Sequence, residues 1–306
     1  MNRYVVGLDG GGTKTAVTVA DLSGSILITF QSGAINPNGE KIENVNRNLA
    51  DILTRLKNVC GGIDNCAAIC IGAAGISNPT VKQVFVSAAA NSGYHGNLVI
   101  TGDHQTAFYG ALGKPCGVIL IAGTGSICYG KNKSGQEHRT GGFGHLIDDE
   151  GSGYAIGRNI LSAVVREFDG RGEKTVLTDM VYHQLNCSNV QELVGFVYNK
   201  STNKRDIAAL SPNLTLACEQ NDEVALSIAK NCADELAKLV VPVVEKLELQ
   251  KENLALAGSI LLKDNYIKND FIKKIRSDFP NLTCHTPKND AAYGAVLIAI
   301  ENMKTV

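Results

Sequence analysis

The segment Tyr4-Val-Val-Gly-Leu-Asp-Gly-Gly-Gly-Thr-Lys-Thr-Ala-Val-Thr-Val-Ala-Asp21 decides the fold of this chain. Two strand-like runs, residues 4–8 and 16–20, flank a glycine cluster, so the segment predicts a β-hairpin. The glycines have no Cβ atoms, and their backbone N–H groups can therefore face an anion directly.

Polar residues around this turn favour a nucleotide that is bound together with Mg²⁺. Lys14 adds a positive charge, and Thr13 and Thr15 add hydroxyl donors. Asp9 would repel phosphate unless a divalent cation lay between the two groups. The alternative is an ordinary hairpin whose glycine turn holds no ligand.

Composition and charge limit the classes of partner. The chain has 306 residues, of which 44% are hydrophobic and 19% charged, enough for one large domain or two ordinary ones. A net charge of −1 argues against nucleic acid and membrane surfaces, which both attract a basic protein. No apolar run reaches the roughly 18–20 residues of a membrane span, and the first strand begins too early for a signal peptide. We therefore expect no nucleic-acid partner and no membrane partner.

Nine cysteines are scattered through hydrophobic runs without any CxxC pair. This odd and dispersed set indicates reduced thiols in the core rather than a disulfide framework or a metal site. The prediction is a protein of the reducing cytoplasm.

Strands and helices alternate over the next hundred residues. Apolar residues recur at three- and four-residue steps over 39–59, which predicts a helix. A strand over 67–71, a helix over 80–91, a strand over 98–101 and a helix to residue 112 follow. This order is typical of an α/β fold, whose ligands bind beyond the ends of the strands. Asp103 follows one such strand.

The pattern then starts again. A strand over 118–122, a glycine turn over 123–126 and a strand over 127–129 repeat the first hairpin. The turn Lys133-Ser-Gly135 corresponds to the earlier turn Leu22-Ser-Gly24. We interpret the two hairpins as diverged copies of one unit. The alternative is a chance similarity between glycine-rich hairpins.

The rest of the chain predicts a second α/β half. A glycine-rich loop over 141–153 leads to a helix over 154–168, and residues 169–221 form helices and polar turns. A long helix over 222–249 contains Pro242, which should kink or break it. A strand over 253–257, the turn Gly258-Ser259 and a final helix over 290–303 complete the order. We expect one domain from residues 1–115 with the C-terminal helix 289–306, and a second from residues 116–288.

Five segments in this order resemble the motifs of the actin/Hsp70/sugar-kinase ATPase superfamily. The two phosphate motifs correspond to residues 4–21 and 117–130, and the two connecting motifs to residues 67–76 and 289–299. The adenosine motif corresponds to residues 254–261. Within the superfamily the chain resembles the N-acetylglucosamine kinases of the BadF/BadG/BcrA/BcrD group. That likeness rests on Leu8-Asp-Gly-Gly-Gly-Thr-Lys-Thr15, Ile121-Ala-Gly-Thr-Gly-Ser126, Gly141-Gly-Phe-Gly-His145 and Asp149-Glu-Gly-Ser152. It implies two ribonuclease H-like lobes with an interdomain cleft for ATP and sugar.

The resemblance also implies roles for individual residues. Asp103 corresponds to the catalytic base, which would accept the proton of a sugar hydroxyl during phosphoryl transfer; an ordinary helix N-cap is the alternative. Asp9 would face Mg²⁺ through water. The ATP contacts would be Asp9, Gly11, Gly12, Thr13, Lys14, Thr15, Gly123, Thr124, Gly125, Gly258 and Ser259. The sugar contacts would be Asn36, Asp103, Thr124, Gly142, Phe143 and Asp149.

The implied activity is ATP-dependent phosphorylation of an amino sugar at C6, in a homodimer. Animal members carry tryptophan where this chain has Phe143, and the sequence does not choose among N-acetylglucosamine, N-acetylmuramic acid and glucosamine. Two other classes remain open: an ATPase activator of an acyl-CoA dehydratase or reductase, which needs cysteines placed for an iron–sulfur cluster, and a chaperone- or actin-like ATPase that acts on a protein partner. No Walker A motif and no dinucleotide fingerprint follow the first strand.

Overall fold

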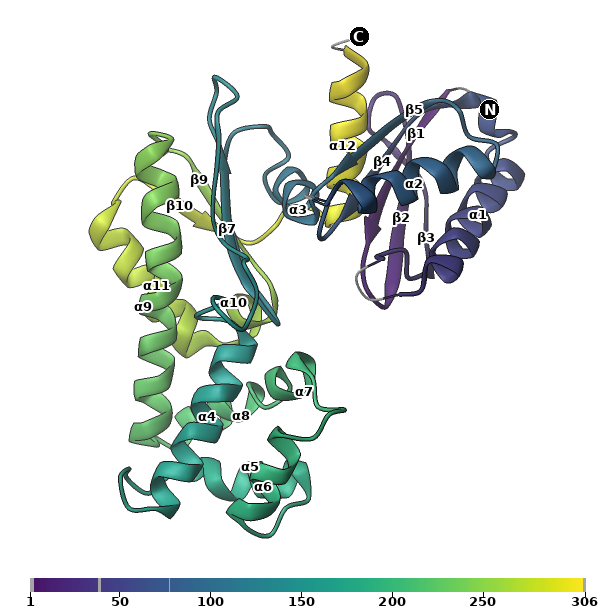
Figure 1. Ribbon diagram of the computed structural model, residues 1–306. Helices are drawn as coiled ribbons and strands as arrows, with labels where there is room; N and C mark the ends of the chain where they lie inside the picture. Colours follow the sequence, from purple (N-terminus) through teal and green to yellow (C-terminus); the bar gives the residue numbers. More distant parts are fainter. Residues whose placement is uncertain (1–2, 38–39, 77, 305–306) are drawn as a thin grey trace. The chain divides into compact units, whose positions relative to one another are not determined.

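The computed structural model describes residues 3–37, 40–76 and 78–304. The chain forms two compact units, one from Met1–Pro115 with Pro287–Val306 and the other from Cys116–Thr286. Each unit contains one five-stranded sheet and its own cluster of buried hydrophobic side chains (Figure 1). The alternation of strands and helices predicted the α/β class, and the two-lobe architecture is the one that the family resemblance implied.

The first unit is built on a mixed sheet in the order β3-β2-β1-β4-β5. Strands β1 and β2 form the predicted hairpin, and β3 continues it as an antiparallel meander, whereas β4 and β5 run parallel to β1. The bounds are β1 (Tyr4–Gly10), β2 (Lys14–Asp21), β3 (Ile26–Gly33), β4 (Cys66–Ala73) and β5 (Asn97–Thr101).

Within the described residues of this unit, four α-helices and one short 3₁₀ helix accompany the sheet. They are α1 (Ile42–Val59), η1 (Ile63–Asn65), α2 (Pro79–Asn91), α3 (Asp103–Leu112) and α12 (Ala291–Lys304). Residue 39, where the first helix was expected to begin, and residues 305–306 lie outside the described residues. Helix α12 is last in the sequence but contacts β1, β4 and α3, so both ends of the chain contribute to the first unit (Figure 1).

The second unit repeats the strand order of the first, as β10-β9-β6-β7-β8. Again a three-stranded antiparallel meander is joined to two strands that run parallel to its first strand. The bounds are β6 (Gly117–Ala122), β7 (Ser126–Lys131), β8 (Glu137–Gly141), β9 (Asn253–Ala257) and β10 (Thr283–His285). The shared topology agrees with the interpretation of two diverged copies.

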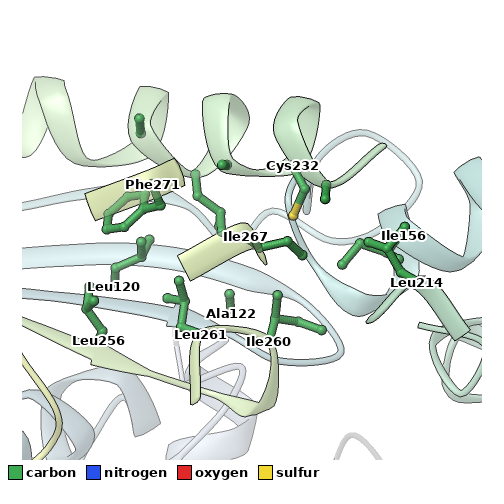
Figure 2. Packing of buried hydrophobic residues seen from close by; sticks show 14 of the residues in the cluster. Leu120, Ala122, Ile156, Leu214, Cys232, Leu256, Ile260, Leu261, Ile267 and Phe271 are labelled. Carbon is green, nitrogen blue, oxygen red and sulfur yellow. The ribbon is translucent and has the colours of Figure 1, made fainter. Parts of the chain in front are cut away.

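Eight helices belong to the described part of the second unit. They are α4 (Gly153–Phe168), α5 (Leu177–Leu185), α6 (Val190–Val197), α7 (Lys204–Ala208), α8 (Pro212–Glu219), α9 (Glu223–Lys246), α10 (Ser259–Lys263) and α11 (Asn265–Asp278). Figure 2 shows Leu120 and Leu256 of the sheet with Phe271 of α11 and Cys232 of α9 in one packed layer. Burial of this layer fixes α9 and α11 on the sheet.

The prediction that Pro242 would break its helix is wrong, because α9 continues through Pro242 to Lys246. A proline removes one N–H from the helical ladder. Pro242 leaves the Lys238 carbonyl without its helical N–H partner, and next to it the Thr140 hydroxyl of β8 donates to the Leu239 carbonyl at 2.5 Å. Contacts of α9 with β6, β7 and β8 hold the helix in place on both sides of that position.

No helix in the described ranges combines the length and the apolar character that a bilayer crossing requires.

Candidate active site

Three parallel strands of the first unit end at the same edge of the sheet. In the register, Asp9 of β1 lies opposite Gly72 of β4, and Gly72 lies opposite Thr101 of β5. Asp103 begins α3 two residues after Thr101. The fold therefore delivers two carboxylates, Asp9 and Asp103, to the carboxyl ends of neighbouring strands, where α/β folds bind ligands.

Asp103 is the first residue of α3, and the extended residue Gly102 occupies the N-cap position. The alternative role of Asp103 as the N-cap is therefore wrong. Its carboxylate accepts a hydrogen bond from the backbone N–H of His104 at 2.9 Å, and its side chain is 52% exposed. An exposed carboxylate at this edge is accessible to a ligand hydroxyl.

A third carboxylate, Asp290, acts on Asp9 and was not singled out from the sequence. Burial first, and then the negative charges of Asp103 and Asp290, together raise the pKa of Asp9 to about 6. Asp290 precedes α12 and accepts a hydrogen bond from the backbone N–H of Tyr293 at 2.8 Å. The signal in the sequence was an acidic residue directly before a helix that begins with small residues.

Glycines hold these carboxylates near one another by allowing close backbone contacts. A Cβ atom on Gly110 of α3 would collide with the carbonyl oxygen of Asp290, and one on Gly294 of α12 with the carbonyl oxygen of Thr106. A Cβ on Gly7 of β1 would likewise collide with the backbone of α12. The approach of α12 to β1 and α3, and with it the position of Asp290, therefore requires glycine at all three positions.

The first glycine turn exposes the side chains expected to meet phosphate. Thr13 and Lys14 are exposed, and Gly11 and Gly12 are partly exposed. The Gly11 N–H donates to the carbonyls of Asp9 and Lys14 at 3.2 and 3.1 Å, and a Cβ on Gly11 would lie 2.7 Å from the Lys14 oxygen. The turn is therefore tightly closed, with its charged and hydroxyl side chains outside.

Thr15 and Asn36 are both buried in the first unit. The Thr15 hydroxyl donates to the Gly33 carbonyl at 2.7 Å, so it already serves the contact between β2 and β3. Asn36 follows Ile35, whose side chain lies against Gly10 at the end of β1. The chain thus brings Asn36 to the strand that carries Asp9.

The second glycine turn, Gly123 to Gly125, is joined to the first turn of α4. The backbone N–H of Gly153 donates to the Gly123 carbonyl at 2.7 Å, and that of Tyr154 donates to the Thr124 carbonyl at 3.3 Å. The β6–β7 turn and the start of α4 consequently form one rigid element of the second unit.

Asp149 packs against the same turn. It is 4% exposed and has a φ of 65°, an uncommon left-handed conformation for a residue other than glycine. Its carboxylate accepts a hydrogen bond from the backbone N–H of Ser126 at 3.3 Å and contacts Gly125 closely. The helix N-cap that follows is Ser152. The structure therefore gives Asp149 a role in shaping the turn, which the sequence did not suggest.

The glycine-rich loop after β8 is exposed. Gly142 has a φ of 74°, and Phe143 is 62% exposed with the guanidinium carbon of Arg139 at 4.7 Å from its ring centroid. The backbone N–H of Phe143 donates to Asp148 at 2.9 Å. These contacts hold the aromatic ring at the surface of the second unit.

A cavity of ≈ 550 Å³ in the second unit brings together Gly123, Thr124 and Ser259. Apolar side chains and two cations, Arg205 and Lys263, also line it. The chain reaches it through Gly258, whose φ is 87° and whose Cβ would collide with the Ala122 carbonyl. Small apolar pockets with a few convergent polar groups are typical of ligand sites. Of the phosphate-turn and adenosine-turn residues predicted for this half, Gly123, Thr124 and Ser259 share this pocket, whereas Gly125 and Gly258 are not part of its described lining.

The carboxylates of the first unit fit a hydrated cation. Mg²⁺ prefers oxygen ligands and keeps several of its waters, and Asp9, with two negative neighbours, is a group whose charged form a cation would stabilise. In residues 3–37, 40–76 and 78–304, no three His, Cys, Asp or Glu side chains gather closely enough to hold a metal ion by themselves. All nine cysteines are free thiols.

Comparisons with known proteins agree on one family. The family model for the BadF/BadG/BcrA/BcrD ATPases matches residues 6–299. An N-acetylmuramic acid/N-acetylglucosamine kinase of Clostridium acetobutylicum is 37% identical over 97% of this chain and 98% of its own. An N-acetyl-D-glucosamine kinase of Dictyostelium discoideum is 31% identical over 98% of each chain. A candidate N-acetylglucosamine kinase of Chromobacterium violaceum shares the fold, with a TM-score of 0.79 at 23% identity, over 97% of this chain and 99% of its own.

Proposed function

This chain belongs to the BadF/BadG/BcrA/BcrD ATPase family, and we propose that it is an ATP-dependent kinase of amino sugars. N-acetylglucosamine is the first substrate we expect, with transfer to the C6 hydroxyl. The observation that carries this proposal is the 37% identity, over nearly the whole of both chains, to a kinase of N-acetylmuramic acid and N-acetylglucosamine.

The proposed chemistry uses Asp103 as the general base. A sugar hydroxyl is a weak nucleophile, so a carboxylate accepts its proton while the oxygen attacks the γ-phosphorus and ADP leaves. The exposure of Asp103 and its position at the strand ends support this role.

The nucleotide is proposed to occupy the cavity beside the β6–β7 turn. Its apolar lining suits a purine base, and Gly258 and Ser259 would approach the adenosine. Gly123, Thr124 and Gly125 would pass the phosphate chain. In the first unit Gly11, Gly12, Thr13 and Lys14 would bind the β- and γ-phosphates, because these residues are exposed or partly exposed.

Mg²⁺ would neutralise the charge between phosphate oxygens and the protein. Asp9 would hold it, through water. The electrostatic coupling of Asp290 to Asp9 supports adding Asp290 to this group.

The sugar contacts are proposed to be Asn36, Thr124, Gly142 and Phe143, with Asp103 at the reacting hydroxyl. The exposed ring of Phe143 supports this role. Asp149 and Thr15 are weaker candidates for direct contact, because both are buried and hydrogen-bonded within the protein.

A panel of amino sugars with Mg-ATP tests the function directly. We expect ADP release with N-acetylglucosamine, and a product whose phosphate is on C6 by phosphorus-coupled NMR. Mannose and glucose serve as controls. Failure of every amino sugar to stimulate ADP release would contradict the proposal.

The cellular context is also a proposal. Nine free thiols suit the reducing cytoplasm, and the resemblance implies a homodimer. Light scattering on the purified protein would decide the oligomeric state, and a mass equal to one chain would contradict the dimer.

A further inference from the structure

The cavity proposed for the nucleotide is lined by two segments that are distant in the sequence. The residues from α8 include Pro212, Thr215 and Leu216, which we call the α8 wall. The residues from α10 and its C-cap include Ile260, Lys263 and Asp264, which we call the α10 wall. The width of the cavity depends on how closely the α8 wall is held to the α10 wall.

In the part of the chain that the structure describes, one side-chain hydrogen bond joins the two walls. The Thr215 hydroxyl donates to Oδ2 of Asp264 at 2.6 Å, across 49 positions of sequence. A hydrogen bond to an ionised carboxylate is shorter and stronger than one between neutral groups. The bond from Thr215 to Asp264 is therefore suited to fixing the distance between the walls.

Both carboxylate oxygens of Asp264 are engaged inside the protein. The residue is 6% exposed, and its Oδ1 accepts a hydrogen bond from the backbone N–H of Ile267 at 3.0 Å, which caps α11. Its Oδ2 accepts the bond from Thr215. Without the Thr215 hydroxyl, a buried carboxylate oxygen would lose its partner, which is unfavourable. Asp264 therefore links α8 to α10 and α11.

Helix α8 presents one face to the core and another to the cavity. Leu214 and Cys218 are buried in the hydrophobic cluster of the second unit. Pro212, Thr215 and Leu216 lie together on a different face, because residues three and four apart are neighbours on a helix. Core packing fixes the axis of α8, and the bond from Thr215 ties its cavity face to α10.

Helix α10 is held against the sheet. A Cβ atom on Gly258, the residue before α10, would lie 2.2 Å from the Ala122 carbonyl oxygen of β6. Ile260 and Leu261 of α10 are buried in the cluster beneath it. The α10 wall is thus fixed by its own packing, and the bond from Thr215 sets the position of the α8 wall against it.

We propose that Thr215 and Asp264 are positioning residues, which set the width of the nucleotide cavity by holding the α8 wall to the α10 wall. This inference rests on the proposed nucleotide cavity and adds two residues to its function. Dispersion attraction falls steeply when a gap opens between a ligand and its pocket. Loss of the bond should therefore weaken nucleotide binding and leave the chemical step unchanged.

Calorimetry with ADP and turnover with Mg-ATP and N-acetylglucosamine test this role. Thr215→Val removes the hydroxyl at nearly constant volume. It should raise the Kd of ADP and the KM of ATP by about tenfold, the factor that corresponds to one net hydrogen bond. The kcat and the KM of the sugar should stay within about twofold of the wild-type values. Thr215→Ser keeps the hydroxyl and should retain the wild-type affinity for ADP.

Thr178→Val is the matched control. The Thr178 hydroxyl of α5 donates to the Glu167 carboxylate of α4 in the same unit, and neither residue belongs to the described lining of the nucleotide cavity. This variant also removes a hydroxyl–carboxylate bond between helices, but it should leave the affinity for ADP unchanged. An equal loss of affinity in Thr178→Val and Thr215→Val would overturn the proposal, because general destabilisation would then explain both.

Asp264→Asn separates positioning from direct contact with the ligand. Asparagine can still cap α11, but its amide replaces the charged acceptor of the Thr215 hydroxyl. Weaker binding of ADP is expected, and this variant carries the test if Thr215→Val does not fold. Wild-type affinity in Asp264→Asn together with a loss in Thr215→Val would assign the Thr215 hydroxyl to the nucleotide and overturn the proposal. Unchanged affinity in Thr215→Val, or an equal loss in Thr215→Ser, would also overturn it.

Binding of ADP requires no sugar, so it tests the positioning role separately from the proposed kinase function. If no amino sugar is phosphorylated but the ADP affinities change as expected, the kinase proposal fails and the positioning role stands. If the wild-type protein binds no ADP, both the nucleotide cavity and the positioning role are wrong.

Discussion

Asp103 and Asp9 have different surroundings although both stand at the carboxyl ends of parallel strands. Asp103 is half exposed at the start of α3, whereas Asp9 is partly buried and lies in the field of two other carboxylates. Environment separates the roles of like residues. The exposed carboxylate suits proton transfer with a ligand, and the buried one suits a cation.

Asp103→Asn should lower kcat by roughly 10²–10⁴-fold, because the amide cannot accept the hydroxyl proton. ATP affinity should stay close to that of the wild-type protein, since the nucleotide contacts are unchanged. Turnover and fluorescent-nucleotide binding measure the two effects. Near-normal turnover in this variant would show that another group is the base.

Asp9→Asn should stabilise the protein at neutral pH and not in acid. The native pKa of Asp9 is about 6 against 3.8 for the isolated group, so the native state binds the proton more tightly than the unfolded state. This contribution to stability is fully present below pH 3.8 and is lost as pH rises through 6. A shift of this size corresponds to about 3 kcal/mol.

Urea unfolding of both proteins between pH 4 and 8, without ligand, measures this difference. The free energy of unfolding of Asp9→Asn should exceed that of the wild-type protein by up to about 3 kcal/mol at pH 8, and the gap should close toward pH 4. A difference in the free energy of unfolding that does not change with pH would contradict the explanation that burial and neighbouring charges raise the pKa of Asp9.

Contacts between elements decide where the carboxylates stand. Helix α12 reaches β1 and α3 only because glycines at positions 7, 110 and 294 leave room for backbone against backbone. A similar close backbone contact occurs in the second unit, where Gly157 allows α4 to pack directly against α7. Close helix packing of this kind ties the geometry of the site to residues that touch no ligand.

Gly110→Ala should destabilise the protein by about 1–3 kcal/mol, because the new methyl group meets the Asp290 carbonyl in a packed contact. Gly195→Ala is the matched control: it also lies within a helix, but its Cβ meets nothing within 4 Å. That control should stabilise the protein by up to about 1 kcal/mol through helix propensity. Thermal unfolding measures the stability of both variants against the wild-type protein. An equal increase in stability in Gly110→Ala and Gly195→Ala would show that α3 and α12 are not in close contact.

At the scale of the whole molecule, the two units share one sheet topology. Both units join a three-stranded antiparallel meander to two parallel strands, and each buries a separate hydrophobic cluster. Separate cores allow separate unfolding transitions. The cavity beside the β6–β7 turn, which we propose for the nucleotide, is formed wholly by residues of the second unit.

ADP without sugar should therefore stabilise chiefly the second unit. At a concentration of 100 times its Kd, a ligand that binds only the folded state adds about 2.7 kcal/mol. Hydrogen exchange with and without ADP should show slowed exchange in α8, α10 and the β6–β7 turn. Protection confined to the first unit would contradict the assignment of the cavity.

Local patterns of sequence were enough to predict most of the elements. Apolar runs predicted most of the described strands, among them β1, β2, β4, β6 and β9, although the predicted ends were only approximate. The hairpins, the α/β order and the repeat of the first unit in the second also followed from the sequence. These features depend on neighbouring residues and on the glycine turns between them, which act over a few positions. The family and the exposed side chains Thr13, Lys14 and Asp103 followed from the same motifs.

Tertiary structure alone decided what depends on residues distant in the sequence. It placed Asp290 in the electrostatic field of Asp9, turned the Thr15 hydroxyl to a strand partner, buried Asp149 under the second turn and carried α9 through Pro242. It also gathered four cations, Arg158, Arg166, Arg171 and Lys204, from α4, the loop after α4 and α7 around one cavity. Burial, charge and packing are sums over neighbours in space, and no local pattern in the sequence contains those neighbours.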